Sequence, residues 1–326
     1  MTFVRMIMIS FLLVGCMLQA KQMTSTPTAA VPVLTSTPAS VDPLNPSLTP
    51  TASITETPLP DSGVDPVLVG SGDIAHCRSD GDEITAAMLD NIPGTVFTTG
   101  DNVYRDGSPE EFANCYDPTW GRHKDRTYPS PGNHDYHTAD AAGYFEYFGS
   151  RAGEPRRGYY SYDLGNWHII VLNSNLPVSG DSPQEAWLRA DLAAHPVTCT
   201  LAYWHHPRFS SGTVHGSSER IEPIWRALYD YGADVVLAGH EHNYERFAPQ
   251  DPQGNADPTR GIRQFVIGSG GRSHYEFGSP IANSEVRNSD TNGLLKLTLH
   301  DGRYSWEFIP EPGKSFTDSG TAPCVE

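Results

Sequence analysis

Short apolar runs alternate with amphipathic stretches along most of the chain. Apolar runs bounded by Gly, Pro or Asp are typical of buried strands, whereas apolar residues that recur every three or four positions indicate helices. The predicted strands cover residues 67–71, 95–99, 127–130, 199–204 and 235–238, and the predicted helices cover residues 82–91, 183–194 and 219–231. Strands that alternate with helices in this way predict an α/β fold built from β-α-β units.

The turn signals agree with this pattern. Residues 182–185 read Ser-Pro-Gln-Glu, which is a capping box with proline at the first helical position. Gly165-Asn166 and Asp301-Gly302 are both sequences that favour tight hairpin turns. The further strand segments that these signals delimit are 159–163, 167–172, 264–267, 294–299 and 303–309.

Polar residues follow five of the predicted strands at their carboxyl ends. They are Asp73, Asp101, Asn133, His205 and the pair His240 and His242. Open α/β sheets place their sites at this edge, so these side chains are expected to converge. Each motif alone has a structural explanation, since Gly-Asp-Asn is also a turn sequence and adjacent histidines often lie at the surface or in a core. Their combination, each at a strand end, predicts one site.

The donor types favour a pair of metal ions. Imidazoles and oxygen donors in this number suit two transition-metal ions better than one structural zinc. A carboxylate has two oxygens, so Asp101 can bridge two ions, and ions about 3.5–4 Å apart can bind both oxygens of a phosphoryl displacement. The net charge of −17 and the absence of a basic run argue against nucleic acid as the main partner. An anionic substrate would therefore depend on the charge of the metals.

Residues 1–21 have the pattern of an export signal: a basic residue, a short apolar run and small residues. Residues 13–16, Leu-Val-Gly-Cys, also resemble a bacterial lipoprotein box, so we expect Cys16 to be lipidated. The alternative is a plain secretory signal that is cut near Ala20. The apolar run is too short to span a bilayer, so we expect membrane attachment through a lipid anchor rather than a spanning helix, and a secreted protein otherwise.

Residues 22–63 are rich in Thr, Pro and Ser and predict a disordered linker, which leaves residues 64–326 as the catalytic domain. The cysteines of this domain are Cys77, Cys115, Cys199 and Cys324. An even number in an exported protein favours disulfides, and three pairings are possible. Cys77 and Cys115 each follow a motif at the same end of neighbouring strands, so we expect them to pair and to leave Cys199 for Cys324. No Cys-x-x-Cys pair supports the alternative, a zinc site.

Five motifs contain the strand-end residues. They are Gly72-Asp73, Gly100-Asp101-x-x-Tyr104, Gly132-Asn133-His134-Asp135, His205 before Pro207, and Gly239-His240-x-His242-x-Tyr244-Glu245-Arg246. This set, with strands from 67 to 309 around it, resembles the calcineurin-like metallophosphoesterases and, within them, the purple acid phosphatases. The resemblance implies a four-layer αββα sandwich: two mixed β-sheets packed face to face and flanked by helices.

The resemblance also implies a ligand set. Asp73, Tyr104 and His242 would bind the first metal, with Asp101 as the bridge. Asn133, His205 and His240 would bind the second metal. In this family the first metal is Fe(III), whose hardness suits a phenolate, and the second is Fe(II), Zn or Mn. With one hydroxide, the ligands carry four negative charges against five positive ones, so the centre stays cationic for a phosphate oxygen.

Three further polar residues flank the predicted ligands. His76 stands one position later than the usual histidine of the first motif, and it could replace Tyr104 as a ligand if its loop bends. The resemblance implies that His134 and His215 orient the phosphate and protonate the leaving group. A dianionic substrate nearby should raise their pKa values. Asp135 is expected to hold the imidazole of His134, with a solvated turn acid as the alternative; His206 is interpreted as a neighbour.

The sequence thus predicts an exported phosphoesterase that hydrolyses phosphomonoesters by attack of a metal-bound hydroxide. Asp101, His134 and His215 have the catalytic roles, and the substrate is a small phosphorylated molecule. The first alternative is a phosphodiesterase or nucleotidase on the same centre. A remote alternative is a non-catalytic surface protein that binds phosphate or a glycan, which the complete set of seven ligands disfavours. No protein partner is inferred.

Overall fold

The central strands form at the positions that their apolar runs predict. The computed structural model describes residues 64–325, all within one unit of the chain (Ile54–Glu326). Four strands have the predicted bounds: β1 (Val67–Ser71), β3 (Thr95–Thr99), β5 (Thr127–Ser130) and β9 (Val235–Ala238). The predicted signal sequence and linker, residues 1–21 and 22–63, lie outside the described residues.

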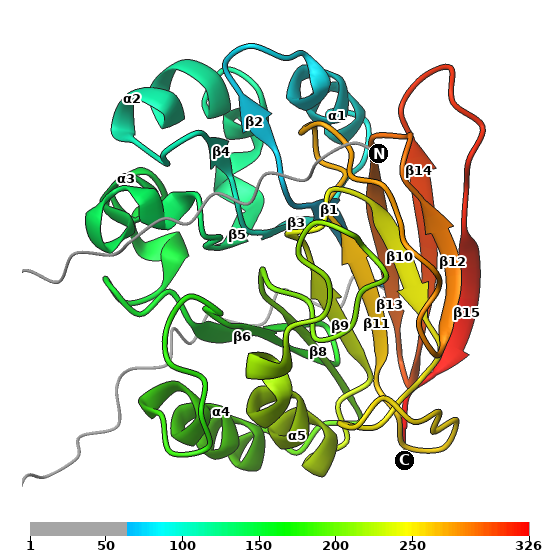
Figure 1. Cartoon of the computed structure of the whole chain (residues 1–326). Helices are drawn as coiled ribbons and strands as arrows, with labels where there is room; N and C mark the ends of the chain where they lie inside the picture. Colours follow the sequence, from blue (N-terminus) through cyan, green and yellow to red (C-terminus); the bar gives the residue numbers. More distant parts are fainter. Residues whose placement is uncertain (1–63, 326) are drawn as a thin grey trace, which may run out of the picture. The chain divides into compact units, whose positions relative to one another are not determined.

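Two mixed β-sheets contain these strands (Figure 1). The other strands of the two sheets are β6 (Tyr160–Leu164), β7 (Trp167–Val171), β8 (Cys199–Tyr203), β10 (Tyr244–Phe247), β11 (Arg263–Ile267), β12 (Ser284–Asn288), β13 (Gly293–His300), β14 (Arg303–Pro310) and β15 (Ser319–Pro323). The six-stranded sheet has the order β15-β14-β13-β1-β3-β5, in which β1, β3 and β5 are parallel. The seven-stranded sheet has the order β12-β10-β11-β9-β8-β7-β6, in which β7, β8, β9 and β11 are parallel.

Three apolar clusters place the sheets between helices. The first cluster lies between the two sheets and includes Leu68 of β1 and Leu237 of β9. The second packs α4 (Pro183–Ala194) and α5 (Glu222–Asp230) on the outer face of the seven-stranded sheet. The third packs α1 (Gly81–Leu89) and α3 (Ala142–Phe148) on the outer face of the six-stranded sheet. The predicted four-layer αββα sandwich is therefore confirmed.

Several elements do not follow from the apolar pattern. The edge strands β12 and β15 contain few apolar residues, and β10 lies in the charged Tyr-Glu-Arg motif. The short elements are β2 (Ala75–His76), β4 (Val103–Tyr104), α2 (Pro109–Glu111), η1 (Phe112–Tyr116), η2 (Trp120–Arg126), η3 (Asp135–His137), η4 (Ala139–Ala141), η5 (Gly149–Ala152) and η6 (Glu219–Ile221). None of the helices between residues 64 and 325 is long and apolar enough to cross a membrane.

Only one half of the predicted capping box forms at α4. The Ser182 hydroxyl accepts a hydrogen bond from the amide of Glu185, as predicted. The Glu185 carboxylate does not accept a hydrogen bond from the amide of Ser182, because it pairs with Arg189 one turn along the helix. A complete capping box occurs instead at α2, where Ser108 and Glu111 bond to each other's amides.

The two expected disulfides are present. Cys77 pairs with Cys115, and Cys199 pairs with Cys324. Cys199 is the first residue of β8 in the seven-stranded sheet, and Cys324 follows β15 of the six-stranded sheet. The second bond therefore links the two sheets covalently.

Candidate metal centre

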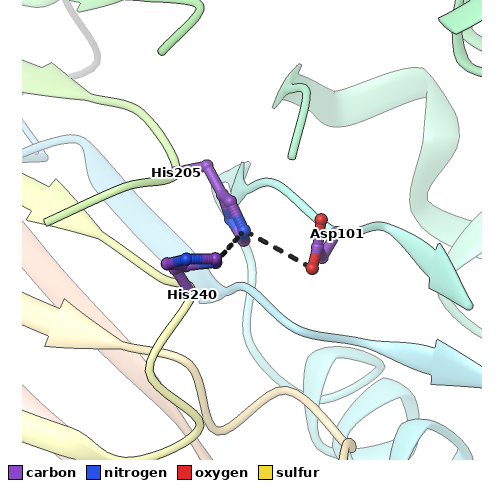
Figure 2. A group of neighbouring side chains, drawn as sticks. All are labelled: Asp101, His205 and His240. Atoms are coloured by element: carbon purple, nitrogen blue, oxygen red, sulfur yellow. Dashed lines mark hydrogen bonds and ion pairs between the residues drawn. The ribbon is translucent and has the colours of Figure 1, made fainter. Parts of the chain in front are cut away.

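The predicted ligands converge where strands of both sheets end. Asp73, Asp101 and Asn133 follow β1, β3 and β5 of the six-stranded sheet. His205 follows β8 of the seven-stranded sheet, and His240 and His242 follow β9. Figure 2 shows the side chains of Asp101, His205 and His240 pointing toward one another. The structure therefore brings together residues that are up to 169 positions apart, Asp73 and His242, at one place.

The first group of donor atoms surrounds the Tyr104 hydroxyl. This hydroxyl lies 2.8 Å from Asp73 Oδ1, 2.9 Å from Asp101 Oδ2 and 3.2 Å from His242 Nε2. His242 Nε2 is also 3.4 Å from Asp73 Oδ1. The four residues that the resemblance assigns to the first metal thus present four donor atoms at one point.

The second group surrounds His205 Nε2. This nitrogen lies 3.0 Å from Asn133 Oδ1, 3.0 Å from His240 Nδ1 and 3.4 Å from Asp101 Oδ2. The oxygen of Asp101 that faces His205 is the same Oδ2 atom that accepts the hydrogen bond of Tyr104. Asp101 Oδ2 is therefore the atom that the two groups share.

The donor atoms fit two metal ions. Separations of 2.8–3.4 Å within each group match the distances between neighbouring ligands of an ion whose bonds are about 2.0–2.2 Å long. Burial and the carboxylates of Asp101 and Asp73 raise the pKa of Tyr104 well above its usual value. A phenolate would form here only beside a strongly charged cation. Phenol, carboxylate, amide and imidazole donors together suit transition-metal ions.

Backbone groups hold the far side of four predicted ligands. Asp73 Oδ2 accepts from the amide of His240, and Asp101 Oδ1 accepts from the amide of His134, both at 2.8 Å. Nδ1 of His205 lies 2.8 Å from the Thr99 carbonyl oxygen, and Nδ1 of His242 lies 2.7 Å from the Ser273 carbonyl oxygen. A carbonyl only accepts, so both Nδ1 atoms carry the proton and leave Nε2 for a metal.

Three ligands have strained backbones. Asp73, Asp101 and His240 have φ values of 58°, 49° and 70°, in the left-handed region that residues with a Cβ rarely adopt. Such conformations cost roughly 1–3 kcal/mol each and persist where the surrounding structure imposes them. A Cβ on Gly132 would lie 2.1 Å from Asp101 Oδ1, so the motif glycine is needed for the close approach of the two loops. At these three positions the left-handed backbone aims a donor atom.

Asp135 does not hold His134, contrary to the prediction. Its Oδ2 atom accepts from the amide of Gly132 at 2.8 Å and from the side-chain amide of Asn102 at 3.0 Å. It is fully buried, which also excludes a solvated turn acid, and burial together with the charge of Asp101 raises its pKa to about 7. Asp135 thus ties together the loops that carry Asp101 and Asn133.

His134 and His215 flank the two donor groups. His134 lies against Tyr104, with ring centroids 4.4 Å apart and the rings tilted by 51°, and its Nδ1 donates to the Arg105 carbonyl oxygen at 2.6 Å. His215 stacks on His240 at 3.8 Å. In the protein alone, burial lowers the pKa of His215, although Glu241 and Asp73 act in the opposite direction. The raised pKa that is expected beside a dianionic substrate stays a prediction.

Glu241 is a site residue that the sequence reasoning missed. Its Oε1 atom accepts from the amides of His215 and Gly216, both at 2.6 Å, and the side chain is fully buried. It therefore fixes the loop that presents His215 above His240. The sequence signal for Glu241 is its position between the two histidines of Gly-His-Glu-His. An acid buried at that position needs hydrogen-bond donors.

The loop after β11 adds two further residues without a sequence signal. Tyr275 stacks on His242, with ring centroids 3.8 Å apart and an interplanar angle of 12°. The Arg272 guanidinium lies 5.0 Å from the centre of the Tyr104 ring, and its amide donates to the carbonyl oxygen of Asp73. Among residues 64–325 its side chain forms no hydrogen bond or ion pair, so Arg272 is a cation beside the first donor group.

The other two histidines near the site join neither donor group. His76 pairs in register with Tyr104 between β2 and β4, but its Nδ1 atom is buried without a hydrogen-bond partner in the described part of the chain. The Tyr104 hydroxyl, and not His76, lies among the donor atoms of the first group. His206 places its Nδ1 atom 2.7 Å from the Ser174 hydroxyl, as expected of a neighbour.

Known proteins resemble this chain in sequence and in fold. A family model described as calcineurin-like phosphoesterase matches residues 60–244. Purple acid phosphatase 15 of Arabidopsis thaliana is 29% identical over 265 residues, which cover 68% of this chain and 48% of the relative. The structure of purple acid phosphatase PPD1 from yellow lupin (Lupinus luteus) seeds has a TM-score of 0.65 at 19% identity and covers 80% of this chain and 54% of the other.

A protein described in other terms shares the fold as well. GAP50, described as the anchor in the inner membrane complex of Plasmodium, has a TM-score of 0.61 at 16% identity over 81% of this chain and 90% of the other. At these identities the structural likenesses show the fold alone. The chain also spans only about half the length of the Arabidopsis relative.

Proposed function

Because the chain belongs to the calcineurin-like phosphoesterase family, we propose that residues 64–326 are a catalytic domain that hydrolyses phosphomonoesters at a centre of two metal ions. The observation that carries the proposal is the position of Asp101 Oδ2, which lies within 3.4 Å of donor atoms from both groups. A carboxylate oxygen shared in this way suits a pair of ions better than a single ion. The named relative, a purple acid phosphatase, supports the choice of monoesters.

The two groups would hold different ions. Asp73, Tyr104 and His242 would hold Fe(III), since a phenolate prefers a hard, highly charged ion. Asn133, His205 and His240 are neutral donors and would hold Fe(II), Zn or Mn. When bound, the two ions supply Lewis-acid activation of water and neutralise charge on the phosphoryl group.

We infer that His134 and His215 act on a bound phosphate, each from the side of one donor group. His134 lies against Tyr104 of the first group, and His215 lies against His240 of the second. Nδ1 of His134 already donates to a backbone carbonyl, which leaves Nε2 for a phosphate oxygen. We assign phosphate orientation to His134 and protonation of the departing oxygen to His215.

A turnover assay tests the proposal against its alternatives. Purified protein loaded with iron and zinc is assayed with an aryl phosphate and an aryl phosphodiester, before and after a chelator and again after the metals are restored. We expect the monoester to be hydrolysed faster, with activity lost and regained with the metals. Preference for the diester would favour a phosphodiesterase. No turnover of either substrate by metal-loaded protein would favour a non-catalytic phosphate- or glycan-binding protein, since the fold alone does not imply activity.

Tyr104→Phe should bleach the iron-loaded protein while part of the activity remains. A phenolate on Fe(III) gives a visible charge-transfer band, and the phenylalanine ring offers no oxygen. Asp73, Asp101 and His242 would still hold the ion, because each keeps its own donor atom. The measurement is the visible spectrum together with metal content and turnover.

His76→Ala is the matched control for Tyr104→Phe. We expect it to keep both the colour and the metal content, because His76 contacts none of the ligands with a hydrogen bond in residues 64–325. An unchanged spectrum in Tyr104→Phe, with loss of the first metal in His76→Ala, would instead make His76 the ligand.

We also propose that residues 1–21 export the protein and that Cys16 anchors it through a lipid. The support is the sequence pattern of residues 13–16 and the disulfides of the domain, which form in oxidising compartments. Wild-type protein should partition into detergent, and Cys16→Ser should move it to the aqueous phase. Aqueous wild-type protein would favour the plain secretory signal.

A further inference from the structure

A second cluster of metal-binding side chains lies on the seven-stranded sheet, away from the centre described above. Its members are His168 of β7, Asp191 of α4 and His195, which caps the carboxyl end of α4. His168 pairs in register with Thr200, near the start of β8, whereas the ligand His205 follows the end of the same strand. The cluster therefore lies toward the opposite end of the strands from the metal centre.

Strand periodicity explains how His168 reaches α4. Ile170, two residues further along β7, packs in the apolar cluster beneath α4 and α5, and His168 faces the same side of the sheet. Asp191 and His195 are four residues apart on α4, so they lie on one face of the helix, above His168. Figure 1 shows α4 beside the β6 end of the sheet, where the last strands have no neighbour beyond them.

The donor atoms converge on the Asp191 carboxylate. His168 Nε2 lies 2.8 Å from Asp191 Oδ2, and His195 Nδ1 lies 3.6 Å from Asp191 Oδ1. The two imidazole rings are nearly parallel, with centroids 4.3 Å apart and an interplanar angle of 14°. The three candidate donor atoms lie within 4.8 Å of one another. Two imidazoles and one carboxylate are a donor set that zinc accepts in proteins.

We propose that His168, Asp191 and His195 bind one zinc ion that is separate from the two ions of the catalytic centre. Tetrahedral zinc with bonds of about 2.0–2.1 Å places its ligand atoms about 3.3 Å apart. The separations are 2.8 Å from His168 Nε2 to Asp191 Oδ2 and 3.6 Å from His195 Nδ1 to Asp191 Oδ1, so a rotation of the carboxylate that brings one oxygen to both imidazoles would complete the site. The ion replaces the hydrogen bonds that now join these groups, and a water molecule takes the fourth position.

Asp163 supplies the support that a metal-binding histidine commonly has. Its Oδ1 atom lies 2.8 Å from His168 Nδ1, so the proton sits on Nδ1 and Nε2 is directed at Asp191. The Ser161 hydroxyl donates to Asp191 Oδ1 at 2.8 Å and orients that carboxylate in turn. His168 is 1% exposed, whereas His195 is 33% exposed, so the site is fixed on one side and open to ions on the other.

The competing explanation is a protonated His168 that bridges two carboxylates. Burial opposes a charge on His168, but the bonds to Asp191 and Asp163 prevail and raise its pKa. That arrangement needs only Asp163, His168 and Asp191. It leaves His195 as a helix cap, because its Nδ1 donates to the Asp191 carbonyl oxygen at 2.8 Å, and zinc binding would replace this bond with one to the ion. A zinc ion uses all three groups and fastens the end of α4 to β7.

Zinc content of His195→Ala tests the proposal. Full-length protein with a loaded catalytic centre is dialysed against micromolar zinc, and bound metal is measured per chain, together with the melting temperature with and without zinc. We expect wild-type protein to keep one more zinc than His195→Ala and to gain several degrees from added zinc that the variant does not gain. Turnover of an aryl phosphate should be equal in both, which separates this site from the catalytic centre.

His300→Ala is the matched control. His300 is also a partly buried histidine beside a carboxylate, with Nδ1 2.5 Å from Asp65 Oδ2, but no second imidazole joins it. It should bind as much zinc as the wild type and show the same thermal response. Equal zinc content and equal thermal shift in wild type and His195→Ala would overturn the proposal and leave His168 as a buried ion pair. Anomalous scattering at the zinc edge would locate the ion directly.

Discussion

Asp101→Asn is expected to lower turnover of phosphomonoesters by at least about 10³-fold and to lower metal content. Removing a supporting group around a metal ligand commonly costs about 10–100-fold, and Asp101 supplies the one atom that both donor groups share, so its loss should cost more. The asparagine oxygen would remain with the His134 amide, which now bonds Oδ1 at 2.8 Å. An NH₂ group, which does not bind metals, would then occupy the position of Oδ2.

Asp125→Asn is a suitable control for this substitution, because Asp125 is exposed and lies in η2, outside the ligand motifs. It should keep the metal content and turnover of the wild type. The measurements are bound metal per chain and turnover of an aryl phosphate. Wild-type turnover with two ions bound in Asp101→Asn would rule out the shared-carboxylate centre.

His215→Ala should slow alkyl phosphates far more than nitrophenyl phosphate. An alkoxide leaves poorly without a proton, whereas nitrophenolate leaves unaided, and general acid catalysis contributes about 10²–10⁴-fold. The ring of His215 stands over His240 because Glu241 holds the amides of its loop. The measurement is the ratio of kcat/KM for the two substrates in variant and wild type.

Glu241→Gln provides an independent check on that role. It keeps the size of the side chain but weakens two hydrogen bonds of 2.6 Å to the His215 loop, so it should shift the substrate ratio in the same direction as His215→Ala. Oε1 of Glu241 accepts from these amides, whereas its Oε2 is buried without a hydrogen-bond partner in residues 64–325. An equal loss on both substrates in His215→Ala would make His215 a phosphate-binding residue instead.

The sequence predicts the parts of the fold that depend on local pattern. Thr95–Thr99 and Val235–Ala238 are buried apolar runs, and their strands begin and end where the runs do. The motif residues could be placed at one site because parallel strands end at one edge of a sheet. The edge strands β12 and β15 could not be predicted, because their residues face solvent on much of their surface and so lack an apolar period.

Supporting roles could not be read from the motifs, because they depend on contacts between distant segments. Asp135 is next to His134 in sequence, yet its carboxylate bonds to Asn102, 33 positions away. Arg272 and Tyr275 reach the site only because the loop after β11 bonds to Asp73 and His242 through backbone groups. Adjacency in sequence is a poor guide to where a buried carboxylate finds its donors, since those donors are set by the packing of whole loops.

The disulfide between Cys199 and Cys324 affects the stability of the protein and not its turnover rate. It lies at the first residue of β8, and His205 comes six positions later, so about 20 Å of extended chain lie between the bond and the predicted ligand. A disulfide of this kind is worth about 2–5 kcal/mol. Reduction of the Cys199–Cys324 bond would remove the covalent link between the two sheets and would leave the ligand loops in place. Oxidation of this cysteine pair would therefore set the lifetime of the protein, and the metals its rate.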